Sequence, residues 1–302
     1  MLRKKLYNSQ TQSSKPASST TPSDIQQTAL FDPAVINSPS QGISKYFPND
    51  EQSPLIMQPF TKQVLDVQRN LSNRLNQHNF LKLPVQYVYN PLDYAKAPNE
   101  LYFTKYCQSP KKLLFVGMNP GPFGMCQTGV PFGDTSRVRE WLQIEGEVSK
   151  PPNECPFRPV QGFDCVRKEQ SGDRFWKFWE SQCGAAENFF KNAFVYNYCP
   201  LAFMDRQGRN VTPADLKECK ELESICDEYY SEIINLMEPN FLIAIGRYIE
   251  KRTHILFKQT GSKIPILCMP HPSPRTINNQ NWPEKALQFL EKNNLKKYFE
   301  LE

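Results

Sequence analysis

Apolar residues form four short continuous runs along the chain. The runs occupy residues 113–116, 193–196, 241–245 and 264–269, and each ends at or near a Gly, Asn or Pro. Continuous apolar strands are typical of sheets that are buried on both faces. The runs therefore predict the strands of a parallel sheet.

Helical patterns surround these strands. Apolar residues recur at helical spacing from Val64 to Leu75, which predicts a first helix there. Other helical patterns cover residues 136–145, 171–182, 213–237 and 247–257, and a last helix begins near Pro283. Thr212 before Pro213 is typical of an N-cap followed by the first residue of a helix. The alternation predicts an α/β fold, a three-layer α/β/α sandwich with a central, mainly parallel four-stranded sheet.

The N-terminal part of the chain has a different composition. Between residues 8 and 28, 17 of 21 positions are Ser, Thr, Asn, Gln or Pro. Because such a segment buries too little apolar surface to offset its conformational entropy, we predict a disordered tail over 1–55 and a catalytic domain over 56–302. Ile43, Tyr46 and Phe47 resemble the sliding-clamp peptides of DNA replication proteins, although Ser40 stands where those peptides carry Gln. A chance hydrophobic cluster is the alternative interpretation.

Composition narrows the class of protein. The nine cysteines are scattered and contain no C-x-x-C pair, which argues against a disulfide framework and a zinc finger. No run of 18 apolar residues is present, so we expect no membrane span. The formal net charge of +5 permits a polyanionic partner without requiring one.

Candidate chemistry follows the predicted strands. Ligands of open α/β sheets bind outside the carboxyl ends of the strands, and Asn119, Asn197 and His271 follow three of the four. An asparagine amide offers a donor and an acceptor that match a nucleobase edge, and Phe132 can stack on a base. A neutral His271 can donate a hydrogen bond to an oxygen that gains negative charge. The set suits recognition of a base and cleavage of a bond whose leaving group is the base anion.

Each of these residues also has a structural interpretation. The asparagines can serve as turn formers at strand ends, His271 as a satisfied structural histidine and Phe132 as ordinary core. The cysteines fit small buried apolar residues, and the aromatic pairs within 175–179 fit core positions. We assign no role to His78 or His254.

Five sequence segments resemble the single-strand-selective monofunctional uracil-DNA glycosylases, within the uracil-DNA glycosylase superfamily. They are GMNPGPFGM at 117–125, GVPFG at 129–133, NYCPL at 197–201, GRNVTPA at 208–214 and HPSPR at 271–275. The resemblance covers roughly residues 60–295 and implies that Asn119 positions the attacking water and His271 stabilises the uracil anion. It also implies that Asn197 reads the base edge and Phe132 stacks on the base. Met118, Gly121 and Met125 would line the pocket.

The same resemblance implies DNA contacts, substrates and a cellular setting. The predicted DNA-binding residues are Gln207, Gly208, Arg209, Asn210, Thr212, Pro272, Ser273, Pro274 and Arg275. The implied enzyme is a monofunctional glycosylase that flips out and removes uracil and 5-hydroxymethyluracil from single- and double-stranded DNA, leaving an abasic site for base excision repair. We expect a monomer that acts in the nucleus. We expect no metal or cofactor, since the clustered cysteines of the iron-sulfur relatives are missing. A non-catalytic protein that binds damaged or single-stranded DNA is the alternative, and a hydrolase of free nucleosides is a third interpretation.

Overall fold

The computed structural model describes residues 57–216 and 219–299 of the 302-residue chain. The predicted disordered tail over 1–55 and the peptide containing Ile43, Tyr46 and Phe47 lie outside these residues. Both stay predictions.

A four-stranded sheet forms the centre of the described domain. Its order is β3 (Ala193–Asn197), β2 (Leu113–Gly117), β6 (Phe241–Ile245) and β7 (Ile266–Met269), and every neighbouring pair is parallel. All residues of the central strand β2 and its neighbour β3 are buried, which explains why the two sequences are continuously apolar. The predicted parallel four-stranded sheet is confirmed.

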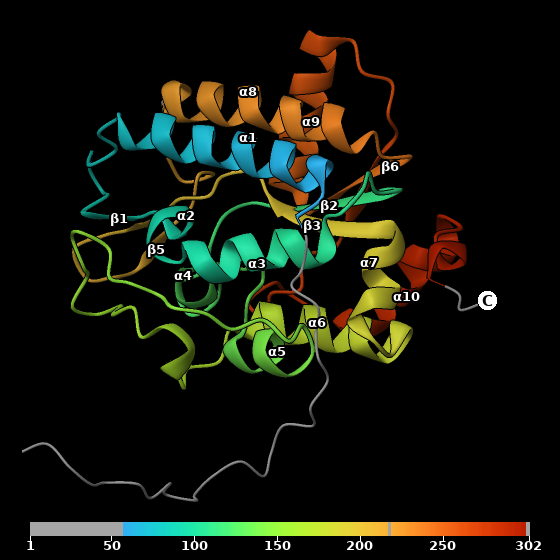
Figure 1. Ribbon diagram of the computed structural model, residues 1–302, viewed down its shortest axis with the longest axis horizontal. Helices are drawn as coiled ribbons and strands as arrows, with labels where there is room; N and C mark the ends of the chain where they lie inside the picture. The colour runs from blue at the N-terminus through green and yellow to red at the C-terminus, as the bar shows by residue number, and fades with distance from the viewer. Residues whose placement is uncertain (1–56, 217–218, 300–302) are drawn as a thin grey trace, which may run out of the picture. The chain divides into compact units, whose positions relative to one another are not determined.

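One face of the sheet is covered by α1 (Pro59–Asn76), α8 (Lys220–Met237) and α9 (Arg247–Thr260), as Figure 1 shows. The side-chain amide of Gln68 in α1 donates to the Tyr196 hydroxyl of β3 at 2.7 Å. On α8, the Tyr230 hydroxyl lies 3.0 Å from Thr253 Oγ1 of α9. Buried hydrogen bonds thus join this helical layer internally and to the sheet.

The other face is covered by α6 (Gln170–Cys183), α7 (Ala186–Asn192) and α10 (Trp282–Lys292) (Figure 1). Phe115 of β2 packs against Trp179 of α6 and Phe189 of α7, with ring centroids 5.3 and 5.8 Å apart. The aromatic residues predicted to be core on this helix are buried. With helices on both faces, the three-layer α/β/α sandwich is confirmed.

Several elements were not predicted from the sequence. Helix α3 (Lys96–Tyr106) lies at the β3 edge, where the Tyr102 hydroxyl donates to the Val195 carbonyl at 2.9 Å and so pairs an edge-strand acceptor. A second, antiparallel sheet has the order β1 (Tyr87–Tyr89), β4 (Ala202–Met204) and β5 (Asn210–Val211). The other unpredicted short elements are α2 (Pro91–Tyr94), α4 (Met125–Thr128), η1 (Gly162–Asp164) and η2 (Lys296–Tyr298), while α5 (Thr135–Glu140) lies in the helical pattern predicted over 136–145.

Two predicted helices have different bounds. The pattern over 213–237 predicted a helix that begins at Pro213, but α8 begins at Lys220. Thr212 does not cap that helix; instead, its backbone N–H and its hydroxyl both donate to Asp215, at 2.9 and 2.7 Å, and close a separate turn. The pattern over 136–145 was also too long, because α5 ends at Glu140 and Gln143 adopts a left-handed φ of 51°.

None of the helices within 57–216 and 219–299 is long and apolar enough to cross a membrane.

Candidate active site

A cavity of about 620 Å³ lies at the carboxyl ends of β2, β3 and β7. Thirteen of the sixteen predicted site residues line it: Met118, Asn119, Gly121, Met125, Phe132, Asn197, Arg209, Asn210, Thr212, His271, Ser273, Pro274 and Arg275. Gln207, Gly208 and Pro272 do not line the cavity, although each belongs to a segment that does. The topology therefore gathers residues that are up to 157 positions apart in the sequence.

The pairing of β2 with β3 fixes one wall of the cavity. Gly117 and Asn197 end the two strands and are direct partners in the parallel register. A Cβ added to Gly117 would overlap Asn197 Oδ1 and approach Phe132 Cε2 at 3.0 Å. The buried Asn197 donates through Nδ2 to the Met125 thioether sulfur at 3.2 Å. Because a thioether is a weak acceptor, a base carbonyl can replace it.

The loop after β2 places Asn119 at the cavity. Its Nδ2 donates to the Leu201 carbonyl at 3.1 Å, which ties the loop after β2 to the loop after β3. With the amide nitrogen engaged in this bond, Oδ1 is the acceptor that remains for a water in the cavity. The arrangement fits an amide that orients a nucleophilic water.

The protonation state of His271 is set by its loop. The Ser273 backbone N–H donates to His271 Nδ1 at 3.0 Å, so Nδ1 is an acceptor and Nε2 carries the proton. Burial lowers the pKa of the imidazole from 6.5 to about 4. Asn279 Nδ2 holds the loop by donating to the carbonyls of His271 and Ser273, at 2.9 and 2.8 Å. At neutral pH the side chain is therefore an uncharged donor in a fixed orientation.

Phe132 is placed by a strained turn. Its φ of 54° lies in the left-handed region, which non-glycine residues rarely adopt. One face of its ring stacks on Phe175 of α6, with centroids 4.7 Å apart and an interplanar angle of 18°. The ring lies 6.0 Å from the His271 ring and lines the cavity. The half-buried ring therefore packs against the core and also lines the cavity, and its stacking on a base stays a prediction.

Glu169 is a site residue that sequence reasoning missed. This residue lines the cavity and caps α6, because its carboxylate accepts from the backbone N–H groups of Ser171 and Gly172. Burial raises the pKa of the carboxyl, and the bonds from Gly172 and Ser171 oppose that rise. A Cβ on Gly121 would lie 3.6 Å from its Cγ. The only sequence signal was a carboxylate three residues before Gly172 at the start of a helical pattern.

The segment 205–210 is ordered by Asp205. This carboxylate accepts from the backbone N–H groups of Gln207 and Arg209, both at 2.9 Å, and pairs with the Arg209 guanidinium at 2.6 Å. Gly208 has a left-handed φ of 70°, and Arg209 stays 75% exposed. On the opposite segment, the Arg275 side chain is exposed. Both arginines are accessible to an anionic ligand.

The side chains that commonly bind metal ions are those of His, Cys, Asp and Glu. No three of them gather as ligands among the described residues. The nine cysteines are free thiols, seven of them buried.

Comparison with known proteins decides the family. The model of the uracil DNA glycosylase superfamily matches residues 104–296. The single-strand selective monofunctional uracil-DNA glycosylase of Rattus norvegicus is 42% identical over 251 residues, covering 81% of this chain and 90% of the relative. The Mus musculus protein of the same name is 41% identical over 253 residues, with the same coverage of both chains. The chain belongs to this glycosylase family.

A solved structure shares the fold of this glycosylase. The crystal structure of wild-type Pedobacter heparinus SMUG2 covers 78% of this chain and 98% of its own, with a TM-score of 0.57 and 21% identity. The family resemblance drawn from the five sequence segments and the assignment as a hydrolase of N-glycosyl bonds are both confirmed.

The His271 imidazole of the glycosylase should titrate near pH 4, because burial disfavours its charged form. The base-release rate should hold above that pH and fall as the pH drops through it, since a proton on Nδ1 breaks the bond from Ser273. Ring-proton NMR with single-turnover rates measures both, and His271→Leu assigns the resonance. A titration near 6.5, the ordinary histidine value, would contradict the buried neutral state.

Gly117→Ala should displace Asn197, because the new methyl overlaps its Oδ1, and should press on the Phe132 ring at 3.0 Å. A shift of about 1 Å in such a group reduces the rate by about 10²-fold. Gly121→Ala is the matched variant: its methyl meets only Glu169 at ordinary contact distance, so its rate should fall at least tenfold less. Single-turnover base release is the measurement, and equal losses in both variants would refute the account of this wall.

Proposed function

We propose that the chain is a monofunctional DNA glycosylase that extrudes a damaged pyrimidine nucleotide and hydrolyses its N-glycosidic bond. The proposed bases are uracil and 5-hydroxymethyluracil, with related oxidised pyrimidines, in single- and double-stranded DNA. The observation that carries the proposal is the convergence of Asn119, Asn197, neutral His271 and stacked Phe132 on one cavity.

Recognition of the base rests on Asn197 and Phe132. Uracil presents a carbonyl acceptor and an N–H donor side by side, and a side-chain amide offers the complementary pair. Before the base enters, the Asn197 Nδ2 donor bonds the Met125 sulfur, and no other acceptor for it occurs among the described residues. Phe132, supported from behind by Phe175, offers its ring for stacking.

Bond cleavage rests on His271 and Asn119. The bond breaks ahead of water attack, which leaves an oxocarbenium-like sugar and a uracil anion. His271 Nε2–H donates to the uracil oxygen that gains charge, and because the imidazole is already neutral and fixed, no reorganisation is needed. Asn119 Oδ1 orients the water. An amide suffices there, since the electrophile is already cationic and a strong base is unnecessary.

The positions of the lysine amines support base removal without strand cutting, because strand cutting needs an amine that forms a Schiff base with the sugar. Lys168 lines the wall, and its ammonium pairs with Asp173 Oδ2 at 3.0 Å. No lysine follows the strand ends at 117–125, 197–201 or 271–275, where a Schiff base with the sugar would form. The product is therefore an abasic site on an uncut strand, which base excision repair consumes, and we place this activity in the nucleus.

The decisive experiment is release of free base from a uracil-containing oligonucleotide, run beside free deoxyuridine. The wild type should release uracil from the oligonucleotide and leave the nucleoside intact. Asn119→Ala should bind the oligonucleotide and lose about 10²–10⁴-fold in single-turnover rate, the range for a group that positions a proton transfer. Binding without release by the wild type would favour the non-catalytic alternative, and release from the nucleoside would favour a nucleoside hydrolase.

Gly121→Tyr should separate the two substrates. Gly121 lines the cavity and carries a hydrogen where a side chain would stand, and a Cβ there would meet Glu169 at an ordinary contact distance of 3.6 Å. We infer that this side of the cavity accepts a polar 5-substituent or a water. A tyrosine ring there should abolish release of 5-hydroxymethyluracil and reduce release of uracil less. Thymine should be a poor substrate because its methyl would displace that water without replacing its hydrogen bonds.

Matched single-stranded oligonucleotides that differ only at the 5-position measure this selectivity. A wild type that removes uracil and leaves 5-hydroxymethyluracil untouched would show that Gly121 is not the selectivity element.

A further inference from the structure

Two arginines share one aromatic ring on the cavity wall. The guanidinium carbon of Arg167 lies 4.1 Å from the Phe123 ring centroid, and that of Arg158 lies 5.2 Å from it. All three residues line the active-site cavity. Neither arginine belongs to the DNA-binding residues that the sequence predicted.

The guanidinium groups are available to a ligand. Within the described residues Arg167 forms no ion pair and is exposed. The Nη1 of Arg158 donates to the Phe157 carbonyl at 2.7 Å, and its buried Nε has no partner among the described residues. Contact with a ring face leaves the N–H groups at the edge of a guanidinium free for a phosphate. In Arg158 the free group is Nη2, because Nη1 bonds the Phe157 carbonyl and Nε is buried.

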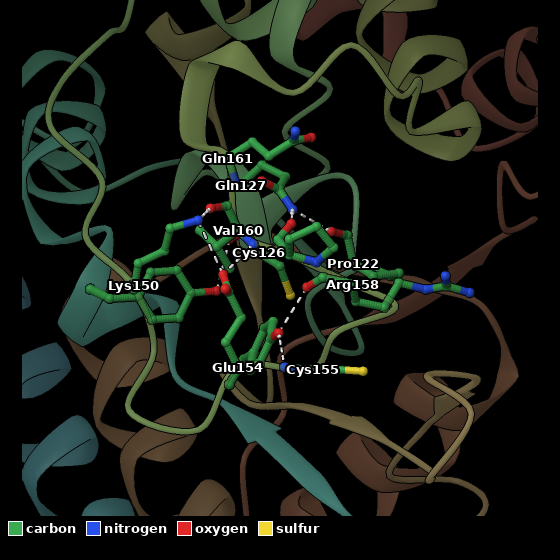
Figure 2. A network of polar contacts seen from close by, with 12 residues as sticks. Pro122, Cys126, Gln127, Lys150, Glu154, Cys155, Arg158, Val160 and Gln161 are labelled. Atoms are coloured by element: carbon green, nitrogen blue, oxygen red, sulfur yellow. Dashed lines mark hydrogen bonds and ion pairs between the residues drawn. The ribbon is translucent and has the colours of Figure 1, made fainter. Parts of the chain in front are cut away.

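A buried side chain joins the two segments that carry this cluster. Gln127 Nε2 donates to the Pro122 carbonyl, next to Phe123, at 2.9 Å and to the Pro159 carbonyl, next to Arg158, at 3.1 Å. Its Oε1 accepts from the Gln161 N–H at 2.8 Å. Figure 2 shows this amide between the two segments, with the Arg158 side chain extending away from the network. The spacing of Phe123 and Arg158 is therefore fixed by the fold.

Further hydrogen bonds and an ion pair fix the segment 154–160 that carries Arg158. The Tyr89 hydroxyl donates to the Arg158 carbonyl and accepts from the Cys155 N–H, both at 2.8 Å. Glu154 accepts from the Val160 N–H at 2.8 Å and pairs with Lys150 at 3.2 Å, as the dashed lines of Figure 2 show. Preorganisation of this kind reduces the entropy lost when a ligand binds.

Positively charged side chains outnumber carboxylates in the cavity lining. Its lining contains five cationic residues, Arg158, Arg167, Lys168, Arg209 and Arg275, and one carboxylate, Glu169. The whole chain has a formal net charge of only +5. Arg158 also adjoins the predicted DNA-binding turn, since a Cβ on Gly208 would lie 3.4 Å from Arg158 Cγ. The cluster thus extends the basic surface of that turn along the cavity rim.

We propose that Arg158 and Arg167, stacked on Phe123, bind the phosphodiester backbone of DNA beside the extruded nucleotide. This site would add a DNA contact to those predicted for segments 207–212 and 272–275. The proposal rests on the proposed function in one respect, that the bound polyanion is DNA. Each guanidinium contacts a phosphate of the strand, and the Phe123 ring lies within cation–π distance of both.

The salt dependence of DNA affinity tests the site. The affinity of Arg158→Gln, Arg167→Gln and the double variant is measured on single-stranded oligonucleotides with a tetrahydrofuran abasic analogue, over a range of salt concentrations. Each lost phosphate contact should weaken binding and reduce the magnitude of the salt slope by about 0.7 on single strands and about 0.9 on duplex. Arg167→Lys should retain the slope, because its charge remains, and lose part of the affinity with the planar stack.

Arg139→Gln is the matched control. Arg139 also lies over an aromatic ring, Phe163 at 5.6 Å, but it pairs with Glu145 and is not among the residues that line the cavity. This variant should retain the wild-type affinity and slope. Thermal unfolding of every variant checks that the fold is intact.

The outcomes separate this proposal from the proposed function. An unchanged slope in the folded double variant, or a loss of thermal stability with unchanged affinity, assigns the arginines to packing over Phe123 and overturns the proposal. If the wild type still releases uracil, the proposed function stands. A wild type that neither binds the oligonucleotide nor releases base overturns both.

Discussion

The parallel pairing of Gly117 with Asn197 is the constraint on which the rest of the site depends. The register of β2 and β3 sets the two residues side by side, and the missing side chain at Gly117 gives the Asn197 amide and the Phe132 ring their room. Asn119 follows two residues later and is tied to the loop after β3 through Leu201. A shift of the register by one residue would turn these side chains to the opposite face, so the sheet itself positions the chemistry.

The cavity lining combines a neutral His271 with five cationic side chains. Burial keeps His271 uncharged, and the Ser273 N–H fixes its proton on Nε2, where it can meet charge that develops on a leaving base. The positive charge lies at the rim, in the arginines around Phe123 and on segments 207–212 and 272–275. In the proposed function, the cationic residues attract the polyanion, and the neutral His271 donates to the leaving base without a counterion that must first be displaced.

Most of the framework follows from local pattern, and the exceptions have physical causes. The four strands are continuously apolar because both faces are covered, and α1, α6 and α9 carry periodic apolar residues because one face of each packs on the sheet. Helix α3 and the sheet of β1, β4 and β5 were missed because they are short or lie where polar and apolar residues mix. The start of α8 was predicted too early, because Thr212 before Pro213 has the sequence of an N-cap. In the structure Thr212 instead donates to Asp215 and closes a separate turn.

The sequence by itself determined the fold class, the strand ends that carry Asn119, Asn197 and His271, and the family, because runs of apolar residues and five contiguous segments record them. Only the tertiary structure decided that Glu169 lines the cavity, that His271 is neutral with its proton on Nε2, and that Arg158 and Arg167 meet over Phe123. These three features depend on burial and on contacts between segments that are distant in the chain. No periodicity or spacing in the sequence encodes such contacts, because they arise when the Gln127 amide and the packed sheet bring the loops together.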